Sequence, residues 1–291
     1  MVDAGATVSS STPADPDAAI SVRGVTREYR RPRTSLLQPS PPVHALRGVS
    51  FDVAHGEHFG IVGESGCGKS TLLRILSGLD RATSGTVMVD GTDISDLPER
   101  KLRFLRERLQ LVFQDPMGSL DPRMRLGDIV VEPLVAQGRP HRREDVAALL
   151  EAVGLRADAA DRYPHQFSGG QRQRISIARA LAPAPRIIVA DEPVSALDVS
   201  VRAQVLNLIA DIVDERSLTL IFVSHDLSVV RHVCDRVAVM NDGEIVEMGL
   251  TDEVYENPRH PYTRRLISAV PTLRKALAGA TTADLTQESP S

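Results

Sequence analysis

The stretch GESGCGKS at residues 63–70 decides the fold of this 291-residue chain. It matches the pattern G-x-x-x-x-G-K-[S/T] at every fixed position, and that pattern forms a loop whose backbone N–H groups surround phosphate oxygens. The context agrees, because the apolar run at 59–62 predicts a buried strand and the leucine spacing at 69–79 predicts a helix. Residues 63–70 therefore predict a nucleotide-phosphate site at a strand-to-helix turn.

The residues of this phosphate loop have distinct expected tasks. Lys69 supplies positive charge to the β- and γ-phosphates, Ser70 offers its hydroxyl to Mg²⁺, and Thr71 contacts the α-phosphate. Cys67 stands at a position of the motif where any residue is allowed, so its expected role is to position the backbone of the loop. The expected nucleotide contacts in this segment are Gly63, Glu64, Ser65, Gly66, Cys67, Gly68, Lys69, Ser70 and Thr71.

A second acidic site follows the apolar run at 187–190, which ends in Asp191 and Glu192. Ligands of open α/β sheets bind at the carboxyl ends of the strands. We expect Asp191 to hold Mg²⁺, directly or through water, and Glu192 to act as the general base that polarises the attacking water.

Strands and helices alternate through the middle of the chain, which indicates a mainly parallel sheet with helices packed on it. Hairpin signals at Asp90–Gly91 and at residues 241–243 add an antiparallel part, and residues 55–56 are typical of another hairpin turn. The expected fold class is α/β: a P-loop ATPase core with a mainly parallel sheet, an antiparallel β part and a helical subdomain.

Composition excludes several classes of function. A net charge of −4 argues against a protein that coats nucleic acid. Two cysteines, Cys67 and Cys234, support neither a disulfide framework nor a Cys-only metal site, and they fit a reducing, cytoplasmic location. No apolar run approaches 18 residues, and residues 1–19 lack the basic and apolar parts of a signal peptide.

Residues 167–171, FSGGQ, resemble the signature motif of ATP-binding cassette (ABC) ATPases. Three other motifs stand in that family's order. Gln114 matches the Q-loop glutamine after the strand-like segment 109–113, SALD at 195–198 resembles the D-loop, and His225 matches the switch histidine. Tyr29 matches the aromatic residue that stacks on adenine, although the Pro-rich segment 30–42 separates it further than usual from the phosphate loop. The resemblance covers residues 20–249.

The family implies a mechanism in which two cassettes dimerise head to tail with ATP between them. Ser168 and the backbone of Gly169 and Gly170 would then bind the γ-phosphate of the partner's ATP. The resemblance implies nucleotide contacts at Gln171 and Asp198 as well, and a metal contact at Gln114 beside Ser70 and Asp191. The catalytic set is Glu192, His225 and Gln114, and the cofactors are ATP and Mg²⁺.

The expected domain organisation has three parts. Residues 1–19 form a disordered tail, residues 20–250 form the nucleotide-binding domain with a helical subdomain at about 98–180, and residues 251–291 form a C-terminal extension and tail. In the extension, NPRHPYT at 257–263 and AVP at 269–271 resemble the tail of the peptide/nickel importer ATPases. Some relatives carry an iron–sulfur cluster on C-terminal cysteines, but the last cysteine here is Cys234, so we expect none.

This second resemblance implies an ATP-hydrolysing subunit of an importer for oligopeptides or dipeptides, peripheral on the cytoplasmic face of the membrane. Its partners would be membrane permease subunits, a second ATPase subunit and, indirectly, an extracellular solute-binding protein, with no nucleic acid. Import of nickel or another small solute, and a non-transport ABC ATPase, stay open as alternatives. The sequence leaves open the solute and whether the chain pairs with itself or with a sister ATPase.

Overall fold

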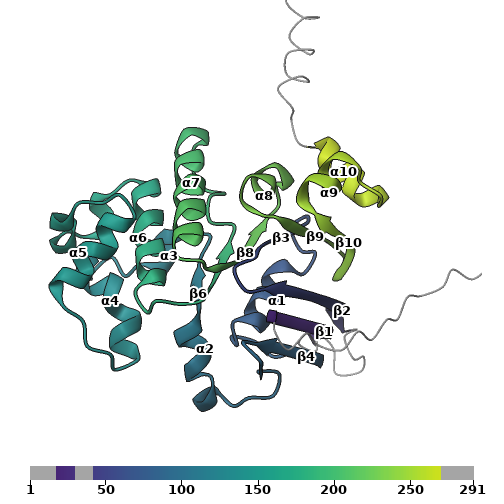
Figure 1. Ribbon diagram of the computed structural model, residues 1–291, viewed down its shortest axis with the longest axis horizontal. Helices are drawn as coiled ribbons and strands as arrows, with labels where there is room; N and C mark the ends of the chain where they lie inside the picture. Colours follow the sequence, from purple (N-terminus) through teal and green to yellow (C-terminus); the bar gives the residue numbers. More distant parts are fainter. Residues whose placement is uncertain (1–17, 30–41, 270–291) are drawn as a thin grey trace, which may run out of the picture.

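The structure is a computed structural model that describes residues 18–29 and 42–269. Its core is a six-stranded sheet in the order β10-β9-β3-β8-β7-β6, beside a four-stranded sheet in the order β2-β1-β4-β5 (Figure 1). The expected α/β class is therefore confirmed. The Pro-rich segment at 30–41, the N-terminal residues 1–17 and the C-terminal residues 270–291 lie outside the described residues.

The six-stranded sheet is parallel except at one edge. β3 pairs in parallel with β8 and β9, β8 pairs in parallel with β7, and β7 with β6, whereas β10 runs antiparallel to β9. The strands are β3 (His58–Val62), β6 (Leu109–Val112), β7 (Ile187–Asp191), β8 (Thr219–Ser224), β9 (Arg236–Asn241) and β10 (Glu244–Leu250).

The four-stranded sheet is antiparallel and contains β1 (Ala18–Tyr29), β2 (Val43–Ala54), β4 (Ser84–Val89) and β5 (Thr92–Asp93). β1 begins at Ala18, two residues before the expected start of order, because Ala18 and Ala19 are buried. The hairpin expected at residues 55–56 is wrong: β2 and β3 flank this turn but belong to different sheets. The hairpins at Asp90–Gly91 and at residues 241–243 are confirmed.

The helix after the phosphate loop, α1 (Lys69–Leu76), is shorter than its leucine spacing predicts. Gly78 adopts a left-handed φ of +68°, which ends the helix, and Leu79 is 52% exposed. The other helices are α2 (Arg103–Arg108), α3 (Pro116–Ser119), α4 (Leu126–Ala136), α5 (Arg143–Ala152), α6 (Gly169–Leu181), α7 (Val199–Glu215), α8 (Leu227–Val233), α9 (Thr251–Glu256) and α10 (Pro261–Ala269), with 3-10 turns at Glu99–Lys101, Ala157–Asp161 and Pro164–Gln166. Across residues 18–29 and 42–269, no helix has the length and apolar character needed to cross a membrane.

Helices α4, α5 and α6 gather at one end of the molecule, on the opposite side of the central strands from α1 in this view (Figure 1). The sequence between α2 and α4 also supplies β6, which pairs with β7 in the central sheet. Leu102, Leu105 and Leu109 recur at helical spacing in the sequence, and this apolar stripe is buried in the same core cluster as the apolar residues of α1. It therefore holds this region to the core and is not an exposed face.

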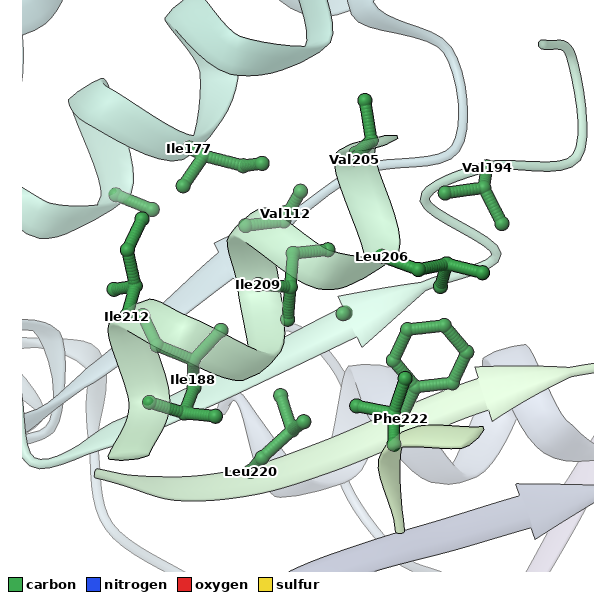
Figure 2. Packing of buried hydrophobic residues seen from close by; sticks show 14 of the residues in the cluster. Val112, Ile177, Ile188, Val194, Val205, Leu206, Ile209, Ile212, Leu220 and Phe222 are labelled. Carbon is green, nitrogen blue, oxygen red and sulfur yellow. The ribbon is translucent and has the colours of Figure 1, made fainter. Parts of the chain in front are cut away.

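Two apolar clusters cover the two faces of the central sheet. Side chains of β8 alternate between them: Leu220 and Phe222 belong to one, and Ile221 and Val223 to the other. Figure 2 shows the first cluster, where α7 lays Val205 and Ile209 over β7 and β8. This burial on both faces holds the strand ends in register, and the strand ends carry the site.

Candidate nucleotide site

Four neighbouring parallel strands end at one edge of the central sheet. Val62 of β3 pairs with Ser224 of β8, Asp191 of β7 pairs with Val223, and Val112 of β6 pairs with Ala190. The phosphate loop, His225, Glu192 and Gln114 follow these strands directly. Parallel pairing therefore brings together motifs that are up to 162 residues apart in sequence, from the loop's first residue, Gly63, to His225.

The phosphate loop folds tightly around its own lysine. Lys69 is buried, and its Nζ donates to the carbonyl oxygens of Gly63 at 2.6 Å and Glu64 at 3.0 Å. A Cβ atom at Gly63 would lie 2.3 Å from the carbonyl oxygen of Met240, and Gly68 has φ +110°, so both positions need glycine. The helix α1 starts at Lys69 and adds its positive end to the site. The loop therefore concentrates donors and positive charge at one point.

Cys67 lies inside the loop and is buried. Its Sγ is 3.9 Å from Lys69 Nζ, but burial outweighs that charge and raises the pKa of the thiol. The side chain is therefore a neutral thiol at neutral pH, which agrees with a role in packing and backbone placement.

The acid pair at the end of β7 has two different environments. Burial, with the charge of Glu192 as a second cause, raises the pKa of Asp191, and the charge of Lys69 opposes this shift. Glu192 has a left-handed φ of +45°, and its N–H donates to Val223 at 2.9 Å. This turn carries the Glu192 carboxylate away from the sheet to the exposed His225, whose Nδ1 lies 2.9 Å from Glu192 Oε2.

Gln114 is exposed just beyond β6. The preceding residue, Phe113, accepts a hydrogen bond at 3.4 Å through its carbonyl oxygen from Nε2 of Gln173, a buried residue of α6. The motif pattern points to Gln114 but not to Gln173. The hydrogen bond between Gln173 and Phe113 connects the segment before Gln114 to α6, the helix that carries the signature motif.

The signature motif forms the N-terminus of α6. Ser168 Oγ accepts the N–H of Gln171 at 3.3 Å, and the Gln171 side chain accepts the N–H of Ser168 at 3.0 Å. Such a reciprocal capping box fixes a helix start. Gly169 is exposed, whereas Gly170 is buried and a Cβ there would lie 2.2 Å from Cγ1 of Val201 on α7. Asp198, also exposed, precedes α7.

These signature residues stand apart from the strand-end cluster within this chain. Figure 1 shows α6 on the other side of the central strands from α1. The strand ends therefore bring together the phosphate loop, the acid pair, His225 and Gln114, whereas Ser168, Gly169, Gly170 and Gln171 begin α6 and Asp198 precedes α7.

Tyr29 ends β1 and already has partners on the protein. Its hydroxyl donates to Asp80 Oδ2 at 2.6 Å, and the guanidinium of Arg27 lies over its ring at 4.4 Å. Hydrogen bonds from Tyr29 and Arg27 to Asp80 lower the pKa of that carboxyl, against the opposing effect of burial, which is the largest single influence. One face of the Tyr29 ring is thus covered by Arg27.

The C-terminal extension reaches the phosphate loop, which the sequence did not predict. The hydroxyl of Tyr262 on α10 accepts the N–H of Glu64 at 2.9 Å. In the sequence, residues 260–262, HPY, indicate only the subfamily. No spacing rule links residues 198 positions apart.

Comparison with known proteins agrees with this geometry. The family model "ABC transporter" matches residues 46–195, and the model "Oligopeptide/dipeptide transporter, C-terminal region" matches residues 246–291. The dipeptide transport ATP-binding protein of Haemophilus influenzae is 49% identical over 85% of this chain and 76% of its own length. The oligopeptide transport ATP-binding protein of Bacillus subtilis is 50% identical over 91% of this chain and 82% of its own length.

A solved structure is similar as well. An ATP-binding cassette in a dimeric post-hydrolysis state, bound to ADP and Pi, matches with a TM-score of 0.70 and 32% identity, over 80% of this chain and 98% of that one. The family match spans more than half of the chain, and it covers the phosphate loop, the signature motif and the acid pair. The chain belongs to the ABC transporter family and is an ATPase cassette of that family.

Proposed function

We propose that this chain is the ATP-hydrolysing subunit of an ABC importer for oligopeptides or dipeptides. The observation that carries this proposal is the pair of family matches in one chain, an ABC cassette at 46–195 and the oligopeptide/dipeptide C-terminal region at 246–291. The names of the relatives from Haemophilus influenzae and Bacillus subtilis support it.

The phosphate loop would bind ATP. Its N–H groups and the start of α1 would face the phosphates, and Lys69, held by the Gly63 and Glu64 carbonyls, would direct its ammonium group to the β- and γ-phosphate oxygens. Ser70 and Thr71 would add their hydroxyls. Tyr29 would stack on adenine with the ring face opposite Arg27.

The donor set at the strand ends fits Mg²⁺, because Asp191, Ser70 and Gln114 each offer an oxygen ligand and magnesium prefers such ligands together with phosphate oxygens. Burial, and then the charge of Glu192, raises the pKa of Asp191, and a bound cation would favour the charged carboxylate against both effects. When bound, Mg²⁺ would neutralise charge on the phosphates during hydrolysis.

Glu192 would act as the general base for the attacking water. The 2.9 Å contact between His225 Nδ1 and Glu192 Oε2 supports a role for His225 in orienting this carboxylate. A proton from the water would pass to Glu192 while the oxygen attacks the γ-phosphorus in line with the leaving ADP.

A second cassette would complete each site. Ser168, Gly169 and Gln171 at the start of α6, and Asp198 before α7, are exposed, which supports contact with ATP held by a partner subunit. The partner is this chain itself or a sister ATPase. Permease subunits would hold the pair at the cytoplasmic face of the membrane, and an extracellular binding protein would deliver the solute.

Reconstitution tests this proposal. The chain is placed in liposomes with its permease, partner ATPase and loaded binding protein, and ATP hydrolysis is measured with peptides, nickel chelates or sugars as cargo. We expect stimulation by peptides only. Stimulation by nickel chelates would favour the nickel alternative, and stimulation by sugars alone would reject the peptide/nickel branch. Activity that needs no membrane subunit and responds to DNA or ribosomes would reject the transport role.

A further inference from the structure

The C-terminal helix α10 makes a direct contact with the phosphate loop. Tyr262 is 3% exposed, and its hydroxyl oxygen accepts the backbone N–H of Glu64 at 2.9 Å. Glu64 has an exposed side chain, so only its backbone carries this contact to the helix. The contact joins a residue of the extension to the second residue of the nucleotide site.

The contact acts on one particular peptide group. The N–H of Glu64 and the C=O of Gly63 belong to the same planar unit. Tyr262 holds the N–H end, and Lys69 Nζ holds the C=O end at 2.6 Å. Because the peptide plane is rigid, the tyrosine fixes the direction of the carbonyl that positions the lysine.

The residues around Tyr262 are arranged to hold it there. Pro261 takes the first position of α10, where proline suits a helix, and Nδ1 of His260 accepts the N–H of Tyr262 at 3.2 Å. The Glu247 carboxylate on β10 accepts the N–H groups of Arg259 at 2.7 Å and His260 at 3.0 Å. The start of α10 is thus fixed to the edge of the central sheet.

Tyr262 also has a suitable charge state. Burial raises the pKa of its phenol, and the hydrogen bond from Glu64 only partly opposes this. The side chain is therefore neutral at physiological pH. It accepts a hydrogen bond without adding negative charge beside a site for phosphates.

We propose that Tyr262 is a positioning residue for ATP binding, which holds the Gly63–Glu64 peptide so that Lys69 and the loop are ready for the phosphates. The C-terminal extension then sets the ATP affinity of its own cassette. This inference rests on the proposed use of the phosphate loop for ATP, and it does not depend on the identity of the transported solute.

The first test removes only the hydroxyl. Tyr262→Phe in the full chain should raise the Kd for ATP with Mg²⁺ by about 3- to 10-fold, the range of one hydrogen bond. Tyr255→Phe on α9, whose ring lies under Arg231, is the matched control and should leave the Kd unchanged. A folded Tyr262→Phe variant with the wild-type Kd overturns the proposal.

The second test separates positioning from general stability. Hydrogen exchange at the Glu64 amide should be faster in Tyr262→Phe, while the helix α6 exchanges as in wild type. In the assembled transporter, KM for ATP should rise and kcat should stay within about twofold, because the hydroxyl touches no reacting atom. A fall in kcat at unchanged KM, or an unchanged Glu64 amide, overturns the proposal.

A third variant changes Glu247, which fixes the start of α10 but does not contact Glu64. It tests the proposal even if Tyr262→Phe does not fold. Glu247→Gln replaces one of the two acceptor oxygens below α10 with an amide group that cannot accept. It should raise the Kd for ATP less than Tyr262→Phe, in the same direction. A lower Tm with an unchanged Kd would show that α10 has a structural role only.

The last test asks whether the tyrosine acts through the lysine. The effects of Tyr262→Phe and Lys69→Ala on the Kd for ATP should be non-additive, because both variants disturb one peptide group. Additive effects overturn the proposed route. If ATP binds wild type tightly but peptides never stimulate the reconstituted transporter, the peptide function fails and this inference stands.

Discussion

The two halves of the ATP site in this chain are held in place by different means. The phosphate loop, Glu192 and His225 follow neighbouring strands of a sheet that is buried on both faces. The signature motif instead begins a single helix, α6, through one capping box formed by exposed residues. The first half is a set of side chains already close together, and the second is a surface. In the proposed function, the first half would supply the hydrolysis chemistry of its own chain, and the second would complete the site of a partner.

The largest effect should come from the strand-end half. Glu192→Gln keeps size and removes the proton acceptor, so hydrolysis should fall by roughly 10²–10⁴-fold while ATP binding stays near normal. Glu215→Gln, at the exposed end of α7, is the control. Turnover and ATP titration measure both variants. Equal turnover in Glu192→Gln and wild type would remove Glu192 from its assigned role.

The surface half should respond differently. Ser168→Arg puts bulk and charge where a partner's γ-phosphate would dock, so dimer-dependent hydrolysis should fall by about 10²-fold while the monomer keeps its ATP affinity. Ala136→Arg makes the same change at an exposed site on α4 and serves as the control. Loss of monomer affinity as severe as in Lys69→Ala would show that the motif acts within its own chain.

The lysine should affect binding first. Lys69→Ala removes a buried charge from the phosphates and should raise the Kd for ATP by about tenfold or more. Lys101→Ala changes an exposed lysine and should have no effect. Titration calorimetry compares the two. If Lys69→Ala binds and hydrolyses ATP as wild type does, residues 63–70 are only a turn.

The smallest effect concerns stability and pH. Because burial, and then Glu192, raises the pKa of Asp191 in the fold, folding favours the neutral form of Asp191 relative to its charged form. The contribution of Asp191 to the free energy of unfolding is therefore present at low pH, and it is lost as the pH rises through the pKa of Asp191 in the folded state. Nucleotide-free Asp191→Asn should thus melt about 1–3 °C higher than wild type near pH 8, a gap that closes below pH 4.

Thermal melts at both pH values, with and without MgATP, check this prediction. The same variant should lose the stabilisation that Mg²⁺ with ATP gives to wild type, because the amide is a poorer magnesium ligand. A variant less stable than wild type at pH 8 would contradict the assigned cause of the shift.

The sequence predicted the strand-end half well because each of its parts is local. A short apolar run followed by GKS, by an acid pair or by histidine specifies strand and loop together, and parallel pairing then brings the loops to one edge. Residues 55–56 predicted a turn correctly but the wrong pairing, since the sheet that a strand joins is decided by distant partners.

The sequence did not predict side-chain contacts between distant segments, because those contacts also depend on residues far apart in the chain. The leucines at 102, 105 and 109 formed a visible stripe, but only the fold shows that the stripe packs in the core with α1. Gln173 contacts the backbone of Phe113, and Tyr262 contacts the backbone of Glu64. Because every residue type has the same backbone groups, the sequence does not identify such partners.

The two glycines of the signature motif carry a consequence for genetics. A Cβ at Gly170 would lie 2.2 Å from Cγ1 of Val201, so a side chain there must displace Val201 or α6. A variant at this position can therefore lose transport through misfolding alone. Gly169 is exposed, and a Cβ there would meet only Leu197 at an ordinary 3.5 Å. A screen for dominant-negative alleles, which need a folded subunit that still joins its complex, should therefore recover Gly169→Ala and miss Gly170→Ala.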